Sequence, residues 1–251
     1  MITDIHTHIL HDIDDGPENL NAVDGLLRCH LAQATHQLVA TPHFNLEKDD
    51  INHFVKVREV RCEEVQSLIK KKSYPITLKL GAELYFSPQL ATVQLDDLVI
   101  EGTDYLLIEL PTQIYPSRLK DTLRDIISNG YTPILAHIER YPYLLASSDI
   151  LIELIEMGVL FQMNAATFVD AHQQQLAKMM LKKDLVHLIA SDAHNCDRRA
   201  PNLSDLQKQY FGTKLFENLQ RCYENAQLVF KGECVVVHQP RPFRKIFGRY
   251  L

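Results

Sequence analysis

Two patterns of hydrophobic and polar residues alternate along this chain, one typical of strands and the other typical of helices. Short apolar runs, typical of buried strands, occupy the ranges 2–8, 38–41, 76–84, 105–110, 133–136, 159–163 and 186–190. Apolar residues that recur every three or four positions predict helices over 20–31, 49–72, 117–129, 149–157 and 170–183, and again from 202 onward. Short strands that alternate with helices at this spacing predict parallel β/α units.

About seven strands of this kind fit a closed β/α barrel better than an open sheet, so the predicted fold class is α/β. The sequence has no linker rich in Gly, Pro or Ser and no internal repeat, so we expect one domain over 1–251. Its last residues, 240–251 (PRPFRKIFGRYL), form a basic and aromatic tail. Such a tail could dock on an acidic partner, remain solvated or add a covering strand.

Composition narrows the class of protein further. With 46% hydrophobic and 23% charged residues, the 251-residue chain is typical of a soluble globular protein, and its net charge of -6 argues against a nucleic-acid partner. Apolar runs are too short to span a membrane, and the strand-like N-terminus does not resemble a signal peptide. Five cysteines without a C-x-x-C motif predict free thiols in a reducing compartment, the cytoplasm by default.

Metal-ligand residue types end or follow most of the predicted strands. They are His6, His8, His43, Glu83, Glu109, His137, Asp192 and His194, with Asp15 in the first loop. Taken singly, some have an ordinary explanation, because Asp15 precedes a turn glycine and Asp192 could cap a helix. The carboxyl ends of parallel strands share one rim of a barrel, so we expect these nine side chains to converge there and hold metal ions.

The chemistry of this set restricts the ions and the reaction. Imidazole and carboxylate ligands without thiolate suit Mn, Fe or Zn, and so many ligands suit two or three ions rather than one. Arg140 follows His137 by three positions, and Arg199 follows His194 by five. A guanidinium beside metal ions favours phosphate as the bound group, although each could also be a surface arginine. Amide or deaminase chemistry is the weaker alternative.

Six segments carry a family resemblance, and they occur in the family's order: 4–17, 39–44 (VATPHF), 81–84 (GAEL), 105–111 (YLLIELP), 133–141 (PILAHIERY) and 187–201. With them the chain resembles the PHP (polymerase and histidinol phosphatase) superfamily, and within it the bacterial capsule and exopolysaccharide tyrosine-protein phosphatases. The resemblance implies a distorted (β/α)7 TIM-like barrel of parallel strands with a trinuclear site, commonly of manganese. The family's usual proline after the fifth-strand histidine is Ile138 here, which removes no ligand.

The same resemblance distributes the ligands over three ions. It implies that the first ion is held by His6, His8, Glu83 and Asp192. It implies that the second is held by Glu83, Glu109 and His137. It implies that the third is held by Asp15, His43 and His194. Arg140 and Arg199 match the family's phosphate-binding positions.

The resulting hypothesis is hydrolysis of phosphotyrosine in protein, with a bacterial tyrosine kinase of capsule synthesis, phosphorylated on its own tail, as the substrate. Hydroxide generated at the metals would attack phosphorus directly, so no phospho-enzyme would form. A cysteine-dependent route requires Arg six residues after Cys, and none of the five cysteines meets this condition. The alternatives are a small-molecule phosphatase, such as a histidinol phosphatase, and a regulator that binds phosphotyrosine without turnover.

Overall fold

The computed structural model describes residues 2–243, 245–246 and 249–250. The parallel strands are β1 (Ile2–Thr7), β2 (Thr35–Ala40), β3 (His43–Phe44), β4 (Thr77–Leu80), β5 (Glu83–Tyr85), β6 (Tyr105–Glu109), β7 (Thr132–Leu135), β8 (Leu160–Asn164) and β9 (Leu188–Ala190). The α-helices are α1 (Leu20–Ala32), α2 (Ile51–Lys72), α3 (Leu119–Ser128), α4 (Ser148–Glu156), α5 (Gln174–Lys182), α6 (Leu203–Tyr210) and α7 (Phe216–Lys231). Short 3-10 helices are η1 (Pro88–Thr92), η2 (Ile138–Arg140) and η3 (Ala165–Phe168).

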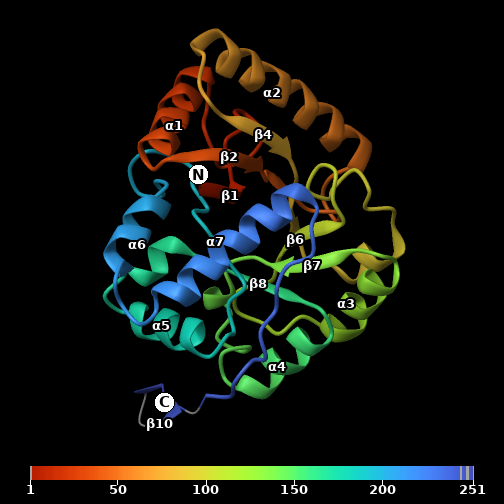
Figure 1. The fold of residues 1–251 in the computed structure, drawn as a ribbon. Coiled ribbons are helices and arrows are strands. Elements are labelled where there is room, and N and C mark those ends of the chain that lie inside the picture. The colour runs from red at the N-terminus through yellow and green to blue at the C-terminus, as the bar shows by residue number, and fades with distance from the viewer. Residues whose placement is uncertain (1, 244, 247–248, 251) are drawn as a thin grey trace.

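The strands form two parallel sheets, in the orders β1-β2-β4 and β3-β5-β6-β7-β8-β9 (Figure 1). Strand β2 continues into β3 past Pro42, which cannot donate a hydrogen bond, and β4 continues into β5 past Gly81. A side chain at Gly81 would begin 3.0 Å from Val39 Cγ1, so the strands approach each other closely there. Because Thr7 forms a parallel bridge with Ala193, the end of β1 lies beside the segment after β9. The predicted parallel β/α fold is confirmed.

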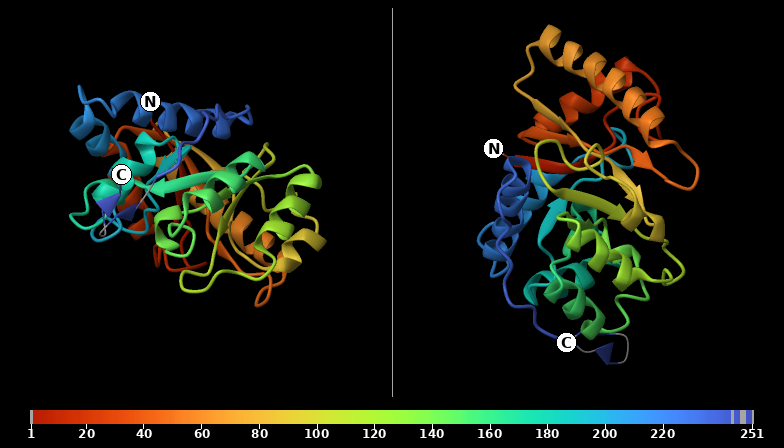
Figure 2. Two further views of the ribbon diagram at one scale, coloured as in Figure 1. Left: turned by 90° about the horizontal axis from the view of Figure 1, so that it is seen from below. Right: turned by 90° about the vertical axis from the view of Figure 1, so that its right-hand side faces the viewer.

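The inner faces of the strands change from apolar to polar toward their carboxyl ends. In β8 the residues that share one face are Leu160, Gln162 and Asn164, and in β6 this face ends at Glu109. Leu160 belongs to a buried apolar cluster that also contains Val229 of α7. Helix α7 therefore covers the amino ends of the strands, as Figure 2 shows, and the polar side chains gather at their carboxyl ends.

Two further apolar clusters lie between the strands and the surrounding helices, one under α1 and α2 and a larger one under α3, α4 and α5. The larger cluster includes Phe243, close to the start of the basic tail. Arg241 donates its backbone N–H to Lys183 O and pairs with Asp184. Farther along, β10 (Lys245–Ile246) and β11 (Arg249–Tyr250) pair antiparallel. Tail residues 244, 247, 248 and 251 lie outside the described residues.

The helical pattern that begins at 202 does not form one continuous helix. It divides into α6 and α7, and Gly212 lies between them with φ of +74°. This left-handed conformation costs glycine little and interrupts helical hydrogen bonding. Among the described residues, no helix is both long enough and apolar enough to cross a membrane.

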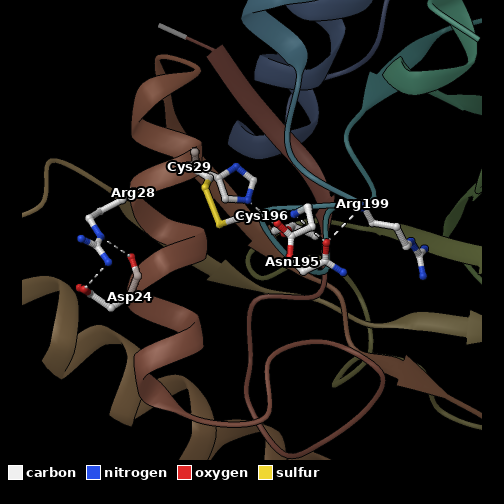
Figure 3. Close-up of a disulfide and its surroundings, with 9 residues drawn as sticks. Asp24, Arg28, Cys29, Asn195, Cys196 and Arg199 are labelled. Carbon is white, nitrogen blue, oxygen red and sulfur yellow. Dashed lines mark hydrogen bonds and ion pairs between the residues drawn. A yellow bond between two sulfur atoms is a disulfide. The ribbon is translucent and has the colours of Figure 1, made fainter.

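The expectation that all five cysteines are free thiols is wrong. Cys29 and Cys196 form a disulfide with their Cα atoms 6.3 Å apart, whereas Cys62, Cys222 and Cys234 are free. Figure 3 shows that the bridge connects α1 to the segment carrying Asn195. The two cysteines are 167 positions apart and share no spacing motif, so the fold alone brings them together.

Candidate metal centre

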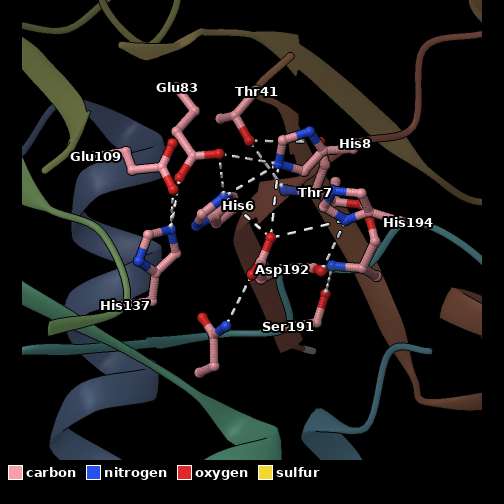
Figure 4. Close-up of polar contacts among 12 residues, drawn as sticks. His6, Thr7, His8, Thr41, Glu83, Glu109, His137, Ser191, Asp192 and His194 are labelled. Atoms are coloured by element: carbon pink, nitrogen blue, oxygen red, sulfur yellow. Dashed lines mark hydrogen bonds and ion pairs between the residues drawn. The ribbon is translucent and has the colours of Figure 1, made fainter. Parts of the chain in front are cut away.

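The nine predicted side chains meet at the carboxyl end of the strands, and Figure 4 labels all of them except Asp15 and His43. Three groups present ligand atoms that all lie within 4.8 Å of one another: His6, His8, Glu83 and Asp192; His43, Glu83 and Glu109; and His8, Asp15, His43 and His194. The first group has the four residues expected for the first ion. His137 joins the second through distances of 2.8 Å to Glu83 Oε1 and 3.6 Å to Glu109 Oε1.

Glu83, at the start of β5, is the side chain shared by most of these contacts. Its buried Oε2 lies 3.2 Å from His6 Nε2, 3.1 Å from His8 Nε2 and 3.1 Å from His43 Nδ1. Oε2 nevertheless has no hydrogen-bond partner. Although burial alone would raise it, the neighbouring His6 and His137 hold the pKa of Glu83 well below its usual range. A carboxylate surrounded in this way can bridge two ions.

Four of the histidines are held from behind by one ring nitrogen, which leaves the other free to bind an ion. His6 Nδ1 lies 3.2 Å from Gln162 Oε1, and His8 Nδ1 lies 2.6 Å from Asp14 Oδ2. His194 Nδ1 donates to the backbone carbonyl of Asp192 at 3.0 Å. His137 Nδ1 lies 3.1 Å from the hydroxyl of Tyr141.

The outer ring nitrogens crowd one another and the carboxylates. The Nε2 atoms of His6 and His8 are only 3.3 Å apart, and Nε2 of His194 lies 3.0 Å from Asp15 Oδ1. Burial and the nearby Glu83 raise the pKa of Glu109 to about 7, because two carboxylates at this distance repel each other. Divalent ions would bind both these crowded imidazole nitrogens and the carboxylates, so the residues present fit a metal cluster.

Two of the expected ligands have strained backbones. His137 has φ of +30° and Asp192 has φ of +55°, a region that residues with a side chain rarely adopt. Hydrogen bonds hold both conformations, because His137 N donates to Gln162 Oε1 at 2.8 Å and Asp192 N donates to His6 O at 2.9 Å. Strain of this kind persists only where surrounding contacts fix it, and it is common at functional sites.

Arg140 and Arg199 both reach Asp192, from opposite sides of its carboxylate. Arg140 donates to Oδ2 at 2.7 Å and Arg199 donates to Oδ1 at 2.7 Å. Arg199 also contacts Asp15 Oδ2 at 3.2 Å. About a third of each arginine side chain is exposed, so both keep N–H groups for an incoming anion. Beside Arg140 lies a polar cavity of about 390 Å³, lined by Glu139, Asn164, Thr167, Asp170 and Gln173 among others.

Sequence reasoning missed the residues that orient the ligands. Asp14 fixes His8, and Gln162 contacts both His6 and His137. Asn164 accepts a hydrogen bond from Gln162 and donates to Asp192 Oδ2, each at 2.8 Å. Strand β8 thus contributes no expected ligand, but its side chains contact His6 of β1, His137 after β7 and Asp192 after β9. Two amide residues at alternate positions of a buried strand were the available signal.

The chain matches known proteins over nearly its whole length. Residues 2–231 match the family described as capsular polysaccharide synthesis, CpsB/CapC. The tyrosine-protein phosphatase CpsB of Streptococcus pneumoniae is 30% identical over 235 residues, covering 86% of this chain and 93% of that protein. The tyrosine-protein phosphatase YwqE of Bacillus subtilis is 30% identical over 258 residues, covering 98% of each.

A solved structure has the same fold. A structure from work on YwqE of Bacillus subtilis and CpsB of Streptococcus pneumoniae, metal-dependent tyrosine phosphatases, aligns with a TM-score of 0.85 and 24% identity. That alignment covers 97% of this chain and 100% of the other. The match over residues 2–231 decides the relationship: this chain belongs to the CpsB/CapC family of capsular polysaccharide synthesis.

Proposed function

We propose that this protein hydrolyses phosphotyrosine in protein, with two or three divalent ions, preferably manganese, held by the nine converging side chains. The observation that carries the proposal is the position of Arg140 and Arg199. Both lie on Asp192, inside the cluster of metal-ligand residues, and both keep exposed donors. Metal ions beside two guanidinium groups match a phosphate ester better than an amide.

The chain's own residues bind and orient the phosphate in this proposal. When bound, the ions would activate a water for attack and neutralise phosphoryl oxygens. Arg140 and Arg199 would bind the remaining phosphoryl oxygens from two sides, which places the phosphorus over the cluster. The nine side chains would hold the ions, and four of them, His6, His8, His137 and His194, are fixed from behind. Phenolate is a fair leaving group, so the reaction requires no dedicated acid from the protein.

The natural substrate we propose is a bacterial tyrosine kinase of capsule or exopolysaccharide synthesis, acting in the cytoplasm. Support comes from the family's role in capsular polysaccharide synthesis and from relatives that are tyrosine-protein phosphatases. The phosphorylated tail of such a kinase would present an accessible phosphotyrosine. The partly exposed arginines would be reachable by a side chain that projects from a protein.

Phosphate release tests the proposal directly. Purified protein is assayed on a phosphotyrosine peptide and on histidinol phosphate, with chelator and after Mn²⁺ is restored. We expect release from the peptide that is lost with chelator, returns with Mn²⁺ and exceeds release from histidinol phosphate. Preference for histidinol phosphate would favour the small-molecule alternative. Tight peptide binding without phosphate release would favour a non-catalytic regulator.

Thiol alkylation separates this chemistry from a cysteine mechanism. The free cysteines are Cys62 and Cys222, which are buried, and Cys234, which is exposed. Burial raises the pKa of Cys62 to about 11 and that of Cys222 to about 12, so neither is a ready nucleophile. Activity should therefore survive alkylation of the native protein. Loss of activity without unfolding would contradict a mechanism that depends on metal alone.

A further inference from the structure

The loop between β6 and α3, residues 110–118, leaves the sheet directly after Glu109 and carries two exposed apolar side chains. Ile114 is 73% exposed and Tyr115 is 39% exposed. Single exposed apolar residues are common on proteins, so exposure alone says little. This pair differs because Tyr115 ends a row of aromatic rings that begins at the metal centre.

The row runs outward from His137. The Tyr141 ring lies 5.8 Å from the His137 ring, and Tyr143 stacks on Tyr141 at 5.9 Å. Tyr115 then meets Tyr143 edge to face at 5.7 Å. Exposure rises along the row, from the fully buried Tyr141 to Tyr115 at the surface. Buried ring contacts thus connect a metal-ligand residue to the rim, where Tyr143 and Tyr115 form its partly exposed end.

Hydrogen bonds fix this row to the loop. Tyr141 Oη accepts from Leu110 N at 2.9 Å, and Tyr143 Oη donates to Pro111 O at 2.5 Å. A rigid aromatic surface loses little conformational entropy when it binds a partner, which is why such surfaces are favourable for recognition.

The other side of the site differs in polarity. The strand order places the loops after β6 and β8 on either side of β7, which is followed by Arg140. The cavity on the β8 side has Val169, 49% exposed, and Ala166 among polar residues such as Asp170 and Gln173. The β6 side presents two adjacent apolar side chains, Ile114 and Tyr115, and is the more apolar of the two sides of a phosphate bound at Arg140.

We propose that Ile114 and Tyr115, backed by Tyr143, bind the peptide that carries the phosphotyrosine, by contacting an apolar side chain next to it. This inference rests on the proposed function and adds the substrate feature that the site selects. The loop that carries this pair begins directly after Glu109. In this proposal a small aryl phosphate contacts the arginines alone, whereas a peptide also contacts the loop.

The test combines changes in the protein with changes in the peptide. Ile114→Ser and Tyr115→Ser are assayed on two phosphotyrosine peptides that differ only in the flanking residue, Leu or Ser, and on p-nitrophenyl phosphate. Val60→Ser on α2 and Phe211→Ser after α6 are the matched controls, since both side chains are exposed and lie on other elements. Thermal unfolding of each variant confirms that it is folded.

We expect each loop variant to raise KM for the Leu peptide about tenfold relative to p-nitrophenyl phosphate, with kcat nearly constant. Tenfold corresponds to about 1.4 kcal/mol, within the range for burying part of an apolar side chain. The Ser peptide should show much less effect. Equal effects on all three substrates, or none on the Leu peptide, would overturn the inference. No phosphate release by the parent protein from either peptide or aryl phosphate would instead overturn the proposed function.

Discussion

Replacing Gln162 should weaken metal binding even though Gln162 is not an expected ligand. Its Oε1 accepts from His137 N at 2.8 Å and lies 3.2 Å from His6 Nδ1, and its Nε2 donates to Asn164. Gln162→Met keeps nearly the same volume but removes every one of these hydrogen bonds. His6 would lose the partner that orients its ring, and His137 would lose the bond that holds its φ of +30°.

The expected magnitudes follow from those contacts. A buried donor left without a partner costs about 1–3 kcal/mol, so the loss for His137 N and its neighbours should lower the free energy of unfolding by about 2–4 kcal/mol. Loss of the groups that orient metal ligands lowers metal affinity by about 10–100-fold. Release of strain at His137 adds to the second effect, because the relaxed backbone carries the imidazole away from Glu83.

Mn²⁺ affinity is measured by competition with a fluorescent chelator, and stability by urea unfolding of the metal-free protein. Gln175→Met serves as the control, because Gln175 is an exposed residue of α5. The reasoning predicts weaker Mn²⁺ binding for Gln162→Met and unchanged binding for the control. Mn²⁺ affinity within twofold of the parent, combined with the expected loss of stability, would show that Gln162 only supports packing and would refute the argument.

Three further outcomes are open to measurement. Burial lowers the pKa of His187 to about 4. Its pKa in the unfolded chain is about 6.5, so protonation of His187 lowers the free energy of unfolding as the pH falls from 6.5 toward 4. In urea unfolding, His187→Asn should therefore remove about 2 kcal/mol of the stability that the parent protein loses between pH 7 and pH 5. Reductant should lower the free energy of unfolding by about 2–4 kcal/mol through the Cys29–Cys196 bridge; Cys29→Ser should abolish this response and Cys62→Ser should keep it. Chelator should lower the melting temperature of metal-loaded protein, because Glu83 and Glu109 repel each other without ions, and an unchanged temperature would contradict the cluster.

The sequence could predict the strands and their order because each is a short apolar run followed by polar residues. Parallel strands end at one rim, so His6, Glu83 and Asp192 could be expected to meet without any knowledge of distances. Their supporting residues required the structure. Gln162 faces His6 across 156 positions, and nothing in the local pattern of β8 specifies which strand it will contact.

Contacts between segments far apart in the sequence also could not be predicted. Cys29 and Cys196 pair because α1 packs beside the segment after β9, and no spacing rule applies over such a separation. The break between α6 and α7 had a local signal in Gly212, but the apolar period continues across it. Local sequence patterns therefore predict helices and strands well. They predict which residues contact one another only where the fold restricts the positions, as at the shared rim of parallel strands.

The metal centre requires two kinds of residue: those that would bind the ions and those that hold the ligands in position. The strand ends supply ligands whose chemistry is visible in the sequence, such as His8 and Glu83. Strand β8 supplies Gln162, which contacts His6 and His137, and the first loop supplies Asp14, which holds His8; the alternating amides of β8 are the one sequence signal for this second kind of residue. A chain that kept all nine ligand types but lost both of these residues would still match the ligand motifs. The imidazoles of His6 and His8 would be free to rotate, so it would bind metal weakly. Recognition of such a site from sequence should therefore weigh buried amides and carboxylates one strand away as heavily as the ligands themselves.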